Sequence, residues 1–154
     1  MDIRVVKASI AHIDYIDIHA RQADIEEFEA LSLSTPKEIM ITALRVSNKA
    51  WTILLDSQPV AMFGVAGRGL LSNTGVPWLV GTDELEMFQK AFLRGCKNYI
   101  QEMASGYNKL ENYVDARNIR AITWLRWLGF TIEKPKPYGI LQKPFHHFYL
   151  EKRL

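Results

Sequence analysis

The sequence contains one cysteine, no long apolar run and no large excess of charge of either sign. Cys96 has no second cysteine to pair with, so the chain cannot form an internal disulfide. No apolar stretch approaches the roughly 18 residues needed to span a bilayer, and the N-terminus MDIRVVKAS lacks the pattern of a signal peptide. These absences predict a cytoplasmic protein without a membrane span. Cys96 falls on the apolar side of a predicted helix, so we expect it in the core.

Charge and histidine spacing argue against two further kinds of site. The 19 Lys and Arg residues are interspersed with 17 Asp and Glu, for a formal net charge of +2, whereas a surface that follows a phosphate backbone needs clustered positive charge. The adjacent His146 and His147 would point to opposite faces of a strand, and His12 and His19 have no acidic partners at metal-ligand spacing. We therefore predict neither a nucleic acid partner nor a metal site.

Length and hydrophobic periodicity predict a single α/β domain over residues 1–154. The chain is 48% apolar and 23% charged, which is enough to build one core. Strand and helix patterns alternate, in the order strand 3–7, helix 9–20 after the N-cap Ser9, an acidic amphipathic piece 22–33, a helix from Thr35, a hairpin of AWTILLD and PVAMFGVAG, strand NTGVPWLVG, helix 83–103, strand 111–116, a helix opened by Asn118, and strands from Phe130 and over Phe145–Leu150. This order predicts a mixed (α+β) sheet of about six or seven strands with helices on both faces.

Pro77 lies inside the apolar stretch NTGVPWLVG. Proline cannot donate a hydrogen bond to a sheet, so within a central strand it indicates either a bulge or a local parting from a neighbouring strand. The stretch is otherwise typical of a buried strand. We expect one of these two irregularities at Pro77.

The stretch YVDARNIRAITWLRWLGF, residues 113–130, reads as a strand followed by an amphipathic helix. Asn118 is a good N-cap, apolar residues recur on one face, and Gly129 stands where a helix often ends in the left-handed conformation. Trp127 falls on the polar side near Arg120, where it would either anchor a protein interface or be covered by the C-terminal strands. A strand, a helix and a glycine stop occur in many α/β domains, so this pattern alone does not define a function.

The same stretch resembles the closing signature of the GNAT N-acetyltransferases. Their helix begins with Asn, has Ala three residues later and Gly-Phe eleven and twelve residues later, which Asn118, Ala121, Gly129 and Phe130 match. The segments WLVGTDEL, LENYVDARN and TWLRWLGF together look like a family of acetyltransferase-like proteins of short-tailed phages, described as internal virion or virion-assembly proteins. The resemblance covers nearly the whole chain and implies a GNAT-like acyl-CoA N-acyltransferase fold.

The resemblance also implies a cofactor site. In GNAT enzymes the fourth strand splays from the fifth, which exposes a backbone N–H to the thioester carbonyl and opens a slot for the pantetheine arm of acetyl-CoA or another acyl-CoA. The matching residues are Trp78, Leu79 and Val80, followed by Gly81 and Thr82 at the junction that leads to the pyrophosphate loop. Asn118 matches the residue that commonly hydrogen-bonds the pantetheine arm, although it is equally a plain N-cap. The acceptor would be a small-molecule or protein amine.

The chain departs from the family pattern at two places. Asp83, Glu84 and Glu86 replace the glycine-rich pyrophosphate loop, and carboxylates in a first helical turn cap that helix and repel a diphosphate. The position that often carries a proton-donating Tyr is Leu125, which cannot donate. No catalytic residue is therefore assigned, and Asp115 and Glu111 are only candidates for a general base.

Two functions remain open on the sequence. The first is an acetyl-CoA-dependent N-acyltransferase with degenerate motifs. The second is a non-catalytic protein of phage virion assembly that reuses the fold, binds phage structural proteins, and acts in the host cytoplasm or within the virion.

Overall fold

The computed structural model describes residues 1–69 and 72–151 and contains one eight-stranded mixed sheet. The strands follow one another in space as β1-β2-β3-β4-β5-β8-β6, with β7 paired to β8. Among the strands of these described residues, only β4 and β5 pair in parallel. Their bounds are β1 (Ile3–Lys7), β2 (Ser47–Leu55), β3 (Gln58–Gly67), β4 (Thr74–Gly81), β5 (Lys109–Asp115), β6 (Thr131–Ile132), β7 (Lys136–Tyr138) and β8 (Lys143–Glu151). The predicted mixed sheet is confirmed, and β7 is a short strand that the sequence pattern did not separate from its neighbours.

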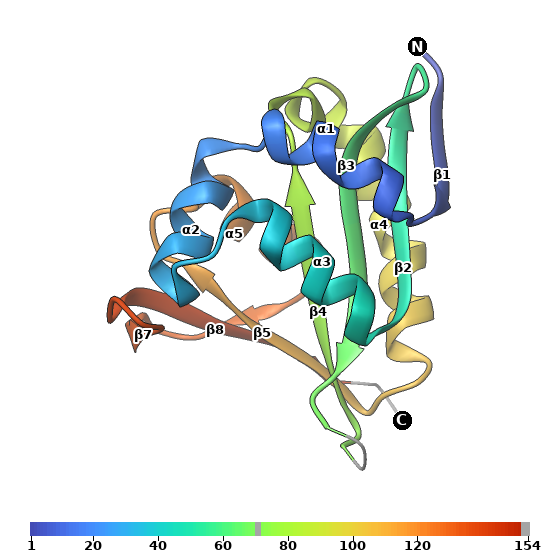
Figure 1. Cartoon of the computed structure of the whole chain (residues 1–154). Coiled ribbons are helices and arrows are strands. Elements are labelled where there is room, and N and C mark those ends of the chain that lie inside the picture. Colours follow the sequence, from blue (N-terminus) through green and yellow to red (C-terminus); the bar gives the residue numbers. More distant parts are fainter. Residues whose placement is uncertain (70–71, 152–154) are drawn as a thin grey trace.

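Helices cover both faces of the sheet, as predicted (Figure 1). One face carries α1 (Ile13–Ile18), α2 (Gln22–Ser32) and α3 (Pro36–Val46). The other carries α4 (Gln89–Ala104) and α5 (Ile119–Trp127). Two 3-10 segments, η1 (Ile10–His12) and η2 (Asp83–Phe88), precede α1 and α4. None of the helices in the described ranges combines the length and apolarity needed to cross a membrane.

The core has two parts, one under each helical layer. The smaller part lies beneath α1 to α3 and includes Ile16, Met40, Met62 and Val80, all fully buried. The larger part lies on the α4 and α5 side and includes the buried residues Phe92, Leu110, Ile122, Trp124 and Phe148. Cys96 packs against this larger part, which agrees with its predicted place in the core.

Local sequence signals explain most of the element boundaries. Ser9 and Thr35 each form a capping box, with His12 and Glu38 as the reciprocal partners. The β2–β3 hairpin turns through Asp56 and Ser57, whose φ angles of 48° and 71° are both left-handed, as a two-residue type I′ turn requires. The N-cap at Ser9, the helix start at Thr35 and the hairpin were expected from the sequence and are confirmed. The turn was expected at Ser57 and Gln58, but it lies one residue earlier, and Gln58 already begins β3.

The start of the fourth long helix differs from the prediction. The pattern predicted one helix over 83–103, but residues 83–88 form η2, and α4 begins only at Gln89. The Thr82 hydroxyl donates to Val60 O at 3.0 Å and makes no cap to the following turn. The turn therefore lacks the side-chain cap that would start an α-helix at Asp83.

Candidate functional site

The central feature of the sheet is a parting between β4 and β5. The two strands pair only at Thr74 with Lys109 and at Gly75 with Leu110. Beyond Gly75 they separate, while β4 keeps a continuous register with β3 from Gly75 to Gly81. Pro77 lies where β4 has left β5, so its missing N–H costs no sheet hydrogen bond. Of the two irregularities expected at Pro77, the parting is confirmed and the bulge is wrong.

Backbone groups of alternate β4 residues face the parting. Thr82 N donates to Val60 O on β3 at 2.9 Å, so residues an even number of positions away also face β3. Pro77, Leu79 and Gly81 therefore direct their backbone groups toward β5. Within the described part of the chain, the N–H and C=O of Leu79 have no hydrogen-bond partner, which makes this N–H a free donor at the parting.

Side chains satisfy several of the other backbone groups along the parting. Asn112 Nδ2 donates to Pro77 O at 2.7 Å, and Asn112 Oδ1 accepts from Tyr113 N at 2.8 Å. Gly81 N donates to Asp24 Oδ2 at 3.1 Å. On β5, Asp115 N donates to Glu27 Oε1 at 2.8 Å. The protein thus closes much of the open edges with its own polar side chains, while among the described residues the N–H of Leu79 remains without a partner.

Four polar side chains from α2 and the start of α5 bridge the open end of the parting, and we call Arg21, Asp24, Glu27 and Asn118 the clasp. Arg21 Nη1 lies 3.0 Å from Asp24 Oδ1, and Arg21 Nη2 lies 3.4 Å from Asn118 Oδ1. Asn118 Nδ2 donates to Asp24 Oδ1 and to Glu27 Oε1, each at 3.4 Å. Arg21, Asp24 and Asn118 are at most 4% exposed, so the clasp is a buried polar network.

Burial raises the pKa values of both clasp carboxyl groups. Burial raises the pKa of Asp24, and the charge of Arg21 opposes that rise. Burial, together with the nearby charge of Asp24, raises the pKa of Glu27 to about 8. Glu27 is half-buried and lines the cavity described next. The pKa of Glu27 thus lies near neutral pH, and its carboxyl shares the cavity with the free N–H of Leu79.

An apolar cavity of about 160 Å³ fills the space between the parted strands and helices α4 and α5. Its wall includes Trp78, Leu79, Cys96, Tyr99, Asn112 and Leu125, as well as all four members of the clasp. A cavity of roughly 150 Å³ is large enough to hold benzene. The space therefore suits a short acyl or thioalkyl chain beside the Leu79 amide.

The six predicted cofactor residues fall into two groups. Trp78, Leu79 and Asn118 line the cavity. The Val80 side chain is fully buried beneath the α1–α3 layer, Gly81 N is bonded to Asp24, and both the N–H and the hydroxyl of Thr82 donate to β3. The N-cap interpretation of Asn118 is confirmed, since its Oδ1 accepts from Ala121 N at 3.4 Å. The parting thus brings three of the six residues to one cavity.

The sequence suggested that the acidic residues after β4 cap their own helical turn. Glu84 and Glu86 bind other side chains instead. Glu84 accepts a hydrogen bond from the Tyr15 hydroxyl at 2.7 Å. Glu86 lies 3.6 Å from Arg21 Nε and 3.5 Å from Arg120 Nη2. The carboxylates are held by distant side chains, yet they still place negative charge where the resemblance implied a diphosphate.

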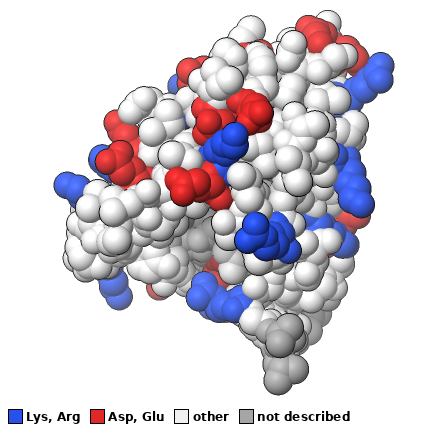
Figure 2. All heavy atoms as spheres, viewed as in Figure 1, with Lys and Arg blue, Asp and Glu red and all other residues white. Residues whose placement is uncertain are grey.

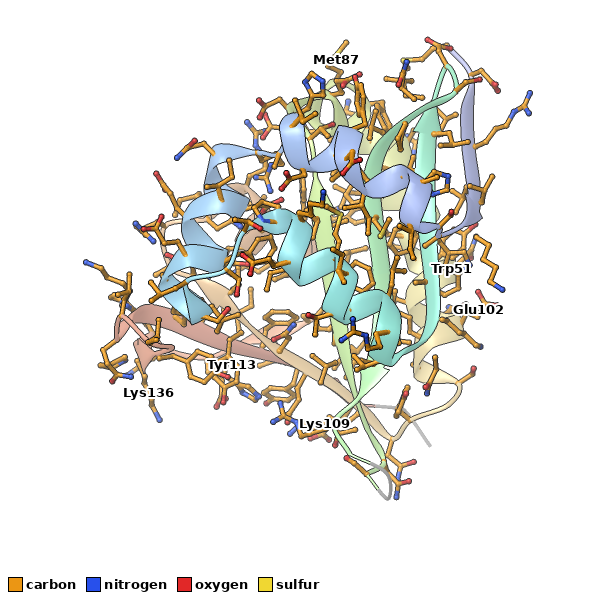
Figure 3. The ribbon with its side chains drawn as sticks, viewed as in Figure 1. Trp51, Met87, Glu102, Lys109, Tyr113 and Lys136 are labelled. Atoms are coloured by element: carbon orange, nitrogen blue, oxygen red, sulfur yellow. The ribbon has the colours of Figure 1, made fainter. Side chains whose placement is uncertain are left out.

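The remaining candidates have structural partners. Asp115 is buried and paired with Arg117 at 2.7 Å. Glu111 is paired with Arg68, Lys109 and His147. Tyr113, two residues farther along β5, lies below α3 in the view of Figure 3. Among the described residues no His, Cys, Asp and Glu cluster has the geometry to hold a metal ion.

The structure also tests the predictions for Cys96 and Trp127. Burial raises the pKa of the Cys96 thiol to about 12, so it is not an activated nucleophile. Trp127 is 48% exposed and its ring lies 4.3 Å from Lys97 Nζ. The C-terminal strands leave it uncovered, so the alternative that they bury it is wrong.

Sequence reasoning missed three members of the clasp. Residues 22–33 were interpreted only as an acidic amphipathic piece. Arg21, Asp24 and Glu27 recur at steps of three, which places them along one side of a helix. That spacing was the available signal, but their partners Gly81, Asp115 and Asn118 lie far away in the sequence. Figure 2 shows acidic side chains gathered over the α1–α3 layer on this face.

Comparison with solved structures identifies the fold. A GNAT-family acetyltransferase from Streptococcus pneumoniae superposes with a TM-score of 0.67 at 11% identity, covering 99% of this chain and 100% of that chain. Spermidine N-acetyltransferase from Vibrio cholerae, in complex with CoA and spermine, gives 0.69 at 10% identity over 97% and 95%. AAC(6')-Ib in complex with ribostamycin and coenzyme A gives 0.67 at 10% identity over 99% and 94%.

Sequence comparison adds nothing to this. No protein-family model matches the chain, and no curated protein matches it. At 10 to 11% identity the structural likeness establishes architecture alone. On the strength of that architecture and of the parted β4 and β5, the chain has the fold of the GNAT acetyltransferases.

Proposed function

We propose that this protein binds an acyl thioester, acetyl-CoA or another acyl-CoA, between β4 and β5 and transfers the acyl group to an amine. The observation that carries the proposal is the free Leu79 N–H beside an apolar cavity of about 160 Å³. A thioester supplies an acyl group that an amine can attack directly. Leu79 N–H would hydrogen-bond the carbonyl oxygen, where negative charge develops, in the manner of an oxyanion hole.

The residues present fit the thioester arm better than the diphosphate. Trp78, Leu79 and Tyr99 give the cavity apolar walls, which suit an acyl and thioalkyl chain. Glu84 and Glu86 stand at the junction after β4, and like charge near a surface costs about 1 kcal/mol or more at close range. The proposed site therefore includes the cavity and no diphosphate contact.

Glu27 is our candidate for the proton donor that Leu125 cannot be. Its pKa of about 8 keeps the carboxyl protonated at neutral pH, and a general acid works best when its pKa lies near the operating pH. Oε1 is held by Asp115 N and Asn118 Nδ2. Oε2 has no partner among residues 1–69 and 72–151, so Glu27 is both oriented and available at the cavity wall.

Titration with S-acetyl-pantetheine or acetyl-CoA, monitored by tryptophan fluorescence, tests binding. The variant Trp78→Phe shows whether Trp78 gives the fluorescence change. Leu79→Pro removes the N–H without breaking a bond to β3, whereas Leu79→Val keeps it. We expect Leu79→Pro to lose most thioester binding and Leu79→Val to retain it. An absence of saturable binding by the wild type up to millimolar thioester would falsify the proposal.

Release of free thiol with an added amine tests transfer. The structural neighbours crystallised with spermine and with ribostamycin make polyamines and aminoglycosides the first acceptors to try. Glu27→Gln should lower turnover while leaving the dissociation constant of S-acetyl-pantetheine unchanged. Unchanged turnover in this variant would remove Glu27 from the reaction.

A second candidate is a non-catalytic phage virion-assembly protein that reuses the fold. Two observations favour it, namely that Asp24 already accepts from Gly81 N and that Leu125 lines the cavity in place of a proton donor. A pull-down against phage structural proteins tests it. Binding of a virion component together with no thioester binding would favour this candidate over the first.

A further inference from the structure

A groove lies between α4 and α5 on the outer side of the helical layer. It has a volume of about 470 Å³ and is lined by Gln89, Leu93, Ile119, Arg120, Thr123 and Trp127, with Trp124 at its floor. Trp124 also lines the apolar cavity. Ile119 is 66% exposed and Trp127 48% exposed. The groove is thus an apolar surface separated from the cavity by one indole ring.

Positively charged side chains of α4 and α5 lie along this groove. Lys90, Arg94 and Lys97 are exposed and spaced at four and three residues, so they share one side of α4. Lys97 Nζ lies 4.3 Å from the Trp127 ring, which places that row beside α5. On α5, Arg126 is exposed, and the exposed Arg120 lies 3.5 Å from Glu86, the acidic residue that precedes α4. Neither residues 87–101 nor residues 116–132 contain an Asp or Glu.

We propose that this groove docks an acidic carrier protein whose pantetheine arm delivers the acyl thioester to the cavity. The inference rests on the proposed function, because it names the donor for that same cavity. Clustered positive charge attracts an acidic partner, and exposed Trp and Arg side chains are typical anchors of protein interfaces. The exposed Trp127 supplies such an anchor.

The junction after β4 favours a protein-borne arm over a free nucleotide. An arm attached to a serine carries a single phosphodiester, whereas CoA brings a diphosphate and a further phosphate to the same junction. Asp83, Glu84 and Glu86 stand at that junction, so the smaller charge is repelled less. The basic row from Lys90 to Lys97 also spans about 10 Å at 1.5 Å per residue, which suits a helix-sized partner.

Isothermal calorimetry with four ligands tests the inference. The ligands are acetylated acyl carrier protein, the same carrier without its arm, S-acetyl-pantetheine and acetyl-CoA. We expect acetylated carrier to bind at least about tenfold more tightly than S-acetyl-pantetheine, with an affinity that falls as salt rises. Trp127→Ala and the double variant Lys90→Glu with Arg94→Glu should each weaken carrier binding about tenfold. Neither should change the dissociation constant of S-acetyl-pantetheine.

The matched control reverses two exposed lysines elsewhere, Lys136→Glu with Lys143→Glu, and should leave carrier binding unchanged. Carrier binding that is no tighter than that of the free arm, or that is insensitive to the groove variants, overturns the inference. Acetyl-CoA binding that is tighter than carrier binding and is lost in Lys90→Glu with Arg94→Glu also overturns it, because the groove would then hold the nucleotide. Failure of S-acetyl-pantetheine to bind the wild type refutes the proposed function, and with it delivery of a thioester to the cavity. Binding of S-acetyl-pantetheine together with no groove-dependent binding of the carrier overturns this inference and leaves the proposed function standing.

Discussion

Replacing Asp24 by alanine should destabilise the fold strongly, because Asp24 is the acceptor at the centre of the clasp. The Arg21 and Asp24 side chains are 4% and 5% exposed and 3.0 Å apart. Leaving one charge of such a buried pair without its partner costs about 3–5 kcal/mol, and leaving Gly81 N–H unsatisfied costs about 1–3 kcal/mol more. Since these terms overlap, we expect a loss of roughly 4–6 kcal/mol, a large part of the about 5–15 kcal/mol typical of a domain.

Urea unfolding of Asp24→Ala, Arg21→Ala and the double variant measures this loss. The double variant should be less destabilised than the sum of the single variants, because it leaves no unpaired buried charge. Asp14→Ala is the matched control, since Asp14 pairs with Lys37 on the exposed surface and should change stability little. A loss below about 1 kcal/mol for Asp24→Ala would refute the view that the clasp ties the parted strands together.

Three further predictions concern single residues. Because the pKa of Glu27 is raised from 4.5 to about 8, the native state keeps a proton that the unfolded state releases, so the contribution of Glu27 to stability is present below pH 4.5 and is lost as pH rises through 8. The free energy of unfolding of the wild type should therefore fall by a few kcal/mol relative to that of Glu27→Gln between pH 5 and pH 9. Parallel pH profiles for the two proteins would contradict this. The half-buried Cys96 thiol, with its pKa raised to about 12, should react with a disulfide reagent far more slowly in native protein than in urea, and equal rates would contradict its place against the core. Gly75→Ala should cost about 1–3 kcal/mol of stability, because its Cβ would lie 2.6 Å from Tyr107 and 2.9 Å from Leu110. Gly95→Ala is the control, because its Cβ meets nothing within 4 Å and the change should stabilise α4 by about 1 kcal/mol. Equal effects of the two variants in thermal unfolding would contradict the crowding at the start of the parting.

Local signals predicted the parts of this fold that depend on neighbouring residues. Ser9 and Thr35 cap the turns that follow them, and Asn118 caps α5. Each cap involves a side chain and a backbone N–H two or three residues away, so the sequence alone was sufficient. The resemblance built on Asn118, Ala121 and Gly129 likewise implied the architecture that the structural neighbours share.

The site depended on contacts that the sequence could not order. Pro77 limited its strand to a bulge or a parting, and only the position of β5 distinguishes the two. Asp24 and Glu27 have partners 57 and 88 residues away at Gly81 and Asp115. The carboxylate of Glu84 was expected to cap its own turn, but Tyr15, 69 residues earlier, binds it instead. Long-range geometry therefore decided which polar groups remain free.

The most direct test of the account follows the backbone amide of Leu79 by ¹⁵N NMR while S-acetyl-pantetheine is added. This ligand has no diphosphate, so repulsion by Glu84 and Glu86 does not affect the result. If the parting of β4 and β5 is a thioester site, the Leu79 amide should shift among the most strongly perturbed signals and saturate with the ligand. An unperturbed Leu79 amide at millimolar ligand, or shifts confined to residues outside the cavity, would contradict the central claim.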